Sequence, residues 1–111
     1  MTLGSDAIHT EIASLLIDLE AELRRSGYWQ FEPLGEAALA SVEPFGVDTM
    51  TLAQWLQFVF IPRMHALAAA QMSLPGRCEV VPIAEEFFGS DDRVRNILAI
   101  LGALDTAINR G

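Results

Sequence analysis

Lysine is absent from this sequence, and basic residues of any kind are few. Its 111 residues include 15 acidic residues against seven basic ones, all arginine, which gives a formal net charge of −8. Nucleic-acid binding draws most of its affinity from lysine and arginine contacts to phosphates. Binding to anionic lipid needs a basic amphipathic segment. The charge therefore argues against direct binding to RNA, DNA or a membrane surface.

A second cysteine and a long apolar run are also missing. Cys78 is the only cysteine, so no internal disulfide can form, and a lone thiol is typical of a reducing compartment. No apolar run approaches the roughly 18–20 residues of a membrane span. The first residues carry Asp6 and Glu11 and no basic residue, unlike a secretory signal. We expect a single domain over residues 1–111 that resides in the cytoplasm.

The motifs of common enzymes and metal proteins are absent as well. The sequence contains no Cys-x-x-Cys, His-Glu-x-x-His or Glu-x-x-His, and no glycine-rich phosphate loop. Cys78 follows Arg77, whose charge should lower the pKa of the thiol slightly. No local signature supports pairing of Cys78 with His65, which favours an inert loop cysteine. We expect no catalytic residue, no metal and no cofactor.

The apolar residues of the sequence follow a mainly helical period. Residues 6–26 carry one apolar stripe, and Gly27 is suited to the position just after the helix. Residues 51–71 form a second helix that opens with the capping box Thr51-x-x-Gln54 and contains Pro62, which should kink it. A short helix is expected over 82–88, and a last one over 91–110, capped by Ser90.

These elements predict an all-α fold, a single-domain four-helix bundle with three long helices and one short. A long aromatic-rich loop, residues 28–50, follows the first helix, with one helical turn expected over 34–41. We expect its aromatic residues to cover an open face of the bundle. Trp29 and Phe31 are expected to pack on the core, although an exposed pair would form a partner-binding patch.

Six residues form a candidate binding or structural cluster, listed here in chain order: Trp55, Gln57, Arg63, His65, Glu85 and Glu86. Arg63 interrupts the most apolar segment, so its guanidinium needs a partner or a route to solvent. We expect an ion pair with Glu86 or Glu85. The alternative is a ligand-binding arginine for a small carboxylate or phosphate. Gln57 is expected to hydrogen-bond to the loop.

The sequence resembles the YqcC-like family of small bacterial proteins. The resemblance covers roughly residues 8–108, is strongest over 44–86, and rests on the string WLQ-x-x-x-IPRM together with four shorter motifs: Pro44-Phe45, Asp48-Thr49-Met50, Leu74-Pro75 and Ala84-Glu85-Glu86. It implies a compact four-helix fold and no established activity. Some members carry a label tied to tRNA pseudouridine synthase C, because the two are commonly encoded side by side.

That label does not imply catalysis here. A pseudouridine synthase resembles a much larger mixed α/β enzyme with a catalytic aspartate in an RNA-binding cleft, and this chain lacks the length, the strands and the positive charge. We therefore expect a non-catalytic accessory protein that binds another protein, with an RNA-modifying enzyme as one candidate partner, and no direct binding of tRNA. The alternative is a small-ligand-binding protein or enzyme that uses Arg63, His65, Glu85 and Glu86.

Overall fold

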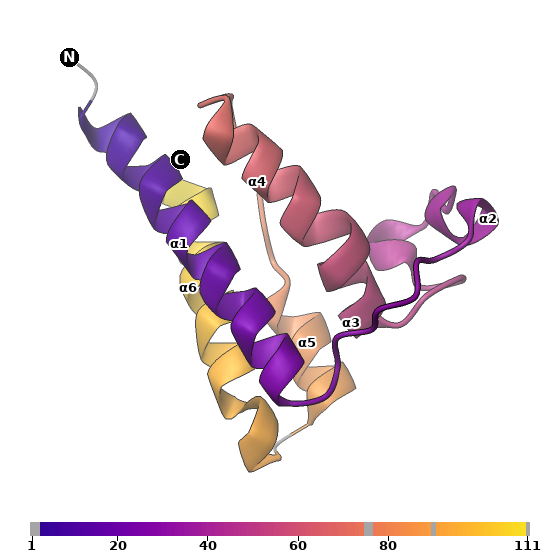
Figure 1. The fold of residues 1–111 in the computed structure, drawn as a ribbon. Helices are drawn as coiled ribbons and strands as arrows, with labels where there is room; N and C mark the ends of the chain where they lie inside the picture. Colours follow the sequence, from indigo (N-terminus) through magenta and orange to yellow (C-terminus); the bar gives the residue numbers. More distant parts are fainter. Residues whose placement is uncertain (1–2, 75–76, 90, 111) are drawn as a thin grey trace.

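The computed structural model describes residues 3–74, 77–89 and 91–110, and no strand occurs in these ranges (Figure 1). In chain order the elements are α1 (Leu3–Arg25), α2 (Glu36–Leu39), the 3₁₀ turn η1 (Pro44–Gly46), α3 (Leu52–Trp55), the π-helical turn η2 (Leu56–Phe60), α4 (Ile61–Ala69), α5 (Val81–Phe88), the 3₁₀ turn η3 (Asp92–Val94) and α6 (Arg95–Arg110). The predicted all-α bundle is confirmed: α1, α6 and the central segment formed by α3, η2 and α4 are long, and α5 is short.

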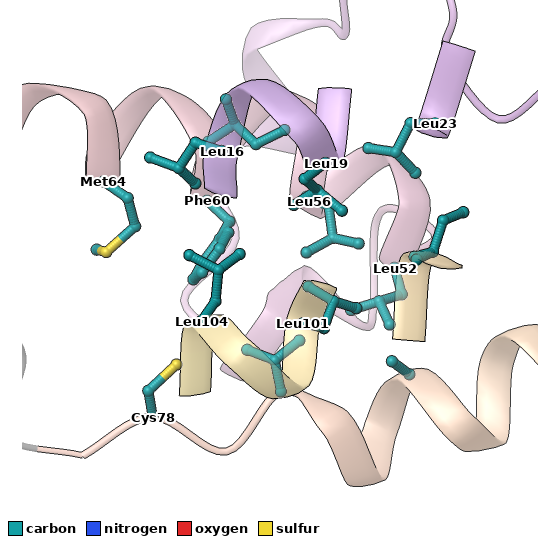
Figure 2. Packing of buried hydrophobic residues seen from close by; sticks show 14 of the residues in the cluster. Leu16, Leu19, Leu23, Leu52, Leu56, Phe60, Met64, Cys78, Leu101 and Leu104 are labelled. Atoms are coloured by element: carbon teal, nitrogen blue, oxygen red, sulfur yellow. The ribbon is translucent and has the colours of Figure 1, made fainter. Parts of the chain in front are cut away.

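The hydrophobic core lies where α1, the central segment and α6 meet, and α1 packs against both α4 and α6. The predicted apolar stripes supply it. Figure 2 shows the core residues of the three segments facing one another: Leu16, Leu19 and Leu23 from α1, Leu52, Leu56, Phe60 and Met64 from the central segment, and Leu101 and Leu104 from α6. Each fully buried leucine or isoleucine contributes about 1.5–3 kcal/mol.

The central segment starts as the sequence predicts. The Thr51 hydroxyl accepts a hydrogen bond from the Gln54 N–H, and the Gln54 side chain accepts one from the Thr51 N–H, which completes the capping box. Pro62 lies within helical residues, at the start of α4. The π turn directly before it was not predicted. Pro62 has no N–H to donate within the helix, and its ring needs space in the preceding turn. The wider π turn accommodates the ring, so the helix continues.

The long connection between α1 and α3 is irregular, as expected, and α2 falls inside the predicted turn at 34–41. Its aromatic residues divide between core and solvent. Tyr28 meets Phe88 edge to face, with ring centroids 5.0 Å apart. Trp29 packs partly against the core, with the Arg24 guanidinium 4.5 Å from its ring centroid. Phe31 is 87% exposed, so core packing was wrong for this residue.

Helices α5 and α6 begin and end close to the predicted residues. Pro82 lies in the first turn of α5, and Gly89, with φ of 72°, ends it. The predicted cap Ser90 lies outside the described residues. In the described part, the Asp91 carboxylate accepts the Arg93 N–H and thereby caps η3, which leads into α6.

Candidate functional site

Two residues of the candidate cluster, Trp55 and Arg63, line one pocket of about 170 Å³, hereafter the Arg63 pocket. It lies between the central segment, the loop at Phe45 and the chain leading into α5. Its full lining is Phe45, Trp55, Phe60, Arg63, Met64, Arg77, Cys78, Glu79, Val80 and Ile108. Apart from two arginines and one glutamate, these side chains are apolar or carry a thiol. The pocket therefore combines an apolar interior with charged groups.

The expected ion pair of Arg63 with Glu85 or Glu86 does not form. Arg63 is exposed, and it takes part in no ion pair within the described part of the chain. Its guanidinium reaches solvent from the surface of α4, so burial does not force a carboxylate partner upon it. The interpretation of Arg63 as a buried, paired arginine was wrong.

The two glutamates lie elsewhere. Glu86 borders a second hollow of about 370 Å³ between the loop before α3 and the outer face of α5, hereafter the Phe87 groove. Its lining is Phe45, Val47, Met50, Thr51, Leu52, Ile83, Glu86 and Phe87. Glu85 lines a separate surface hollow with Gly89 and Asp91. His65 is half-buried on α4 and lines neither the Arg63 pocket nor the Phe87 groove.

Gln57 links the central segment to the loop, as expected. Its side chain is 7% exposed. Its Oε1 accepts the Gln30 N–H at 3.0 Å, and its Nε2 donates to the Gln30 carbonyl at 2.6 Å. Gln54 adds a hydrogen bond from its Nε2 to the Gln30 side chain at 3.0 Å. The three contacts hold Gln30, near the start of the loop, against α3 and the π turn.

Charge is unevenly distributed over the surface. Six of the seven arginines form ion pairs in the described ranges: Arg24–Glu20, Arg25–Glu22, Arg77–Glu79, Arg93–Asp91, Arg95–Asp92 and Arg110–Glu11. Glu86, the carboxylate in the lining of the Phe87 groove, belongs to no such pair. The apolar hollow is therefore bordered by a carboxylate that no described arginine neutralises.

Cys78 is buried, and its environment opposes ionisation. Burial and the neighbouring Asp105 carboxylate raise the pKa of the thiol to about 12. The Cys78 Sγ donates to Asp105 Oδ1 at 3.1 Å. Arg77, expected to lower this pKa, is paired with Glu79 instead, at 2.8 Å. The inert cysteine of the sequence interpretation fits this geometry, but the direction expected for its pKa was wrong.

This burial yields a labelling prediction. Iodoacetamide at about pH 8 should alkylate Cys78 more than about a thousandfold faster in the urea-unfolded protein than in the native one, because only the thiolate reacts and its native fraction is very small. Mass spectrometry of timed samples measures both rates. Comparable rates would show that the thiol is accessible and ionised in the folded state.

Two residues that the sequence interpretation missed organise this region. Asp105 accepts hydrogen bonds from the Val80 and Val81 N–H groups, each at 3.0 Å, and so caps α5 from the neighbouring helix. The Asn109 side chain pairs with both the N–H and the carbonyl of Cys78. Their spacing of four residues places both on one face of α6, which was a readable signal.

Neither a metal-binding cluster nor a membrane-spanning helix occurs in the described part of the chain. Within residues 3–74, 77–89 and 91–110, no group of three or more histidine, cysteine, aspartate or glutamate side chains is arranged to hold a metal ion. The His9 Nε2–H donates a hydrogen bond to the Met72 carbonyl oxygen at 2.9 Å. None of the described helices has the length and apolar character needed to cross a bilayer.

Comparison with known proteins places this helical bundle in a family. The family described as "tRNA pseudouridine synthase C" (DUF446) matches residues 11–107. The chain belongs to this family. Protein YqcC of Escherichia coli is 39% identical over 98 residues, which cover 87% of this chain and 90% of YqcC. An "Uncharacterized protein" of Haemophilus influenzae is 36% identical over 94 residues, 85% of this chain and 89% of that one.

The fold is shared with a solved relative. The solution NMR structure of YqcC from E. coli superposes with a TM-score of 0.79 at 37% identity and covers 92% of this chain and 88% of that one. The YqcC-like resemblance drawn from the sequence is thereby confirmed.

One relative is much longer. A protein of Pectobacterium carotovorum named "tRNA pseudouridine synthase C" is 48% identical over 65 residues, which are 59% of this chain and only 17% of that protein. Most of that relative therefore lies outside the segment that this chain matches.

Proposed function

We propose that this protein is a non-catalytic accessory module of the bacterial cytoplasm that docks onto a basic segment of another protein through the Phe87 groove. The observation that carries the proposal is the combination of an apolar groove, an unneutralised carboxylate in its lining and a net charge of −8. Ile83, Phe87 and Val47 expose 37%, 42% and 68% of their surfaces there. Glu86 lines the same groove.

The apolar and acidic lining of the Phe87 groove indicates which kind of partner segment can bind there. A partner segment that presents apolar side chains flanked by lysine or arginine would cover the groove and pair with Glu86. Glu86 lies on α5, which forms one wall of the groove. Long-range attraction would favour the encounter, since the whole chain carries a charge of −8.

A tRNA pseudouridine synthase is the partner to test first. Enzymes that act on tRNA need basic surfaces. The Pectobacterium relative joins a segment like this one to a much longer chain named as such a synthase. This arrangement supports an association between the present protein and such a synthase in the cell. It assigns no catalysis to the present chain. The alternative function would need its four residues to line one cavity. They do not: Arg63, His65, Glu85 and Glu86 share no hollow in the described part of the chain.

Groove substitutions should weaken this docking. Isothermal titration of the protein into a purified tRNA pseudouridine synthase C should give binding that weakens as salt rises, because exposed charges are screened beyond about 10 Å at 0.1 M ionic strength. Glu86→Lys should reduce the affinity about tenfold or more by placing like charges together. Phe87→Ser should reduce it by a similar factor through loss of apolar contact.

Matched controls lie on α1. Asp18→Lys and Ile17→Ser make the same changes at exposed positions that line neither hollow, and both should bind as the unaltered protein does. The absence of salt-dependent binding would overturn the synthase as partner. Binding that the groove variants leave unchanged would overturn the groove. Tight binding of tRNA to the protein alone, in a filter assay at low salt, would overturn the protein-docking proposal itself.

A further inference from the structure

The wall of the Arg63 pocket depends on the π turn. Trp55 and Phe60 are five residues apart, and a regular α-helix turns about 100° per residue, which would place their side chains about 140° apart around the axis. The wider turn η2 over Leu56–Phe60 brings them onto one face instead, with ring centroids 5.3 Å apart. Phe45 adds a third ring, 5.0 Å from Trp55 and edge-on to it. Such π turns are frequent at functional sites.

The pocket has the size and lining for one apolar group. Met64, Val80 and Ile108 are almost fully buried and contribute to its lining beside the three aromatic residues. Its volume of about 170 Å³ is comparable to a cavity of about 150 Å³ that admits benzene. A single aromatic ring or a branched aliphatic chain is the group that this space accepts.

One positive charge at the pocket forms no ion pair with the residues that the structure describes. Arg77 donates from both Nε and Nη2 to Glu79 Oε1, at 3.1 and 2.8 Å, so these two lining residues neutralise each other. Arg63 is the remaining charged lining residue, and it forms no ion pair with any described residue. The chain has 15 acidic residues, yet Arg63 forms no ion pair among the described residues. This arginine lies at the edge of the aromatic pocket.

We propose that the Arg63 pocket binds a small carboxylate ligand. Its apolar part, a ring or a branched chain, lies against Trp55 and Phe60, and its carboxylate pairs with the Arg63 guanidinium in a charge-assisted hydrogen bond. Cys78 contributes its buried thiol to the lining. The site is separate from the proposed docking function, since only Phe45 lines both hollows.

A pair of matched probes tests the proposal. 3-Phenylpropionate carries a ring and a carboxylate, and 3-phenylpropanamide has the same shape without the charge. Titration of the ¹⁵N-labelled protein with the acid, followed by NMR, should shift the amide signals of Phe45, Trp55 and Cys78, with a Kd on the order of 1 mM, as expected for a ligand of this size. The amide should bind about tenfold more weakly.

Arg63→Gln should weaken binding of the acid about tenfold and leave binding of the amide unchanged. This variant should fold, because Arg63 is exposed and pairs with no carboxylate in the described part of the chain. Arg95→Gln removes an arginine that is paired with Asp92 on the surface and lines a different hollow, so it should bind as the unaltered protein does. Equal affinity for acid and amide, or unaltered binding by Arg63→Gln, would overturn the proposal. Absence of localised shifts with both 3-phenylpropionate and 4-methylpentanoate would also overturn it.

Discussion

Replacing Asp105 with alanine should lower the free energy of unfolding by about 3 kcal/mol. One carboxylate accepts three hydrogen bonds, from the Cys78 thiol and from the Val80 and Val81 N–H groups. Alanine leaves those backbone donors at the start of α5 without their acceptor, and hydrogen bonds to a charged group contribute about 1.5–3 kcal/mol. Urea denaturation followed by tryptophan fluorescence measures the change.

Asp105→Asn is the matched variant. Its amide keeps one oxygen acceptor but directs an NH₂ group at a backbone N–H, so about half of the loss should remain. Asp18→Ala, on the exposed face of α1, should change stability by less than about 0.5 kcal/mol. A loss below that limit for Asp105→Ala would mean that water replaces the carboxylate and that α5 does not depend on it.

The positions of the helices could be predicted because each has its signal within a short stretch of sequence. The apolar spacing over 6–26, the Thr51–Gln54 capping box and the stop at Gly89 depend on neighbours only a few residues away. The π turn could not be predicted in the same way. Its residues have the composition of an ordinary α-helix, and Pro62 permits either a kink or a widened turn.

The candidate site was harder to predict because its contacts join distant parts of the chain. Trp55 and Arg63 share a pocket, but its other walls come from Phe45 and from the chain before α5. The expected pair of Arg63 with Glu86 assumed burial, and the arginine is exposed. The spacing of Asp105 and Asn109 places both on one face of α6, but no local feature identifies the distant backbone groups that Asp105 caps.

Replacing Gln57 with leucine should lower the free energy of unfolding by about 3 kcal/mol. Leucine has a similar volume, so the packing of the π turn is largely retained. The change removes both hydrogen bonds to Gln30 and leaves its N–H and carbonyl without their side-chain partner. An unsatisfied backbone group costs about 1–3 kcal/mol when it is buried, and Gln30 is half-buried. Urea denaturation measures the loss.

Hydrogen exchange separates this mechanism from a general loss of packing. The Gln30 amide should be protected in the unaltered protein and exchange rapidly in Gln57→Leu, because its acceptor is Gln57 Oε1. Gln54→Ala is the control: it removes the capping-box side chain and a contact to the Gln30 side chain, at a cost of about 1 kcal/mol, but leaves that amide its acceptor. If the Gln30 amide exchanges equally fast in all three proteins, Gln57 does not hold the loop against the π turn, and the loop has another anchor.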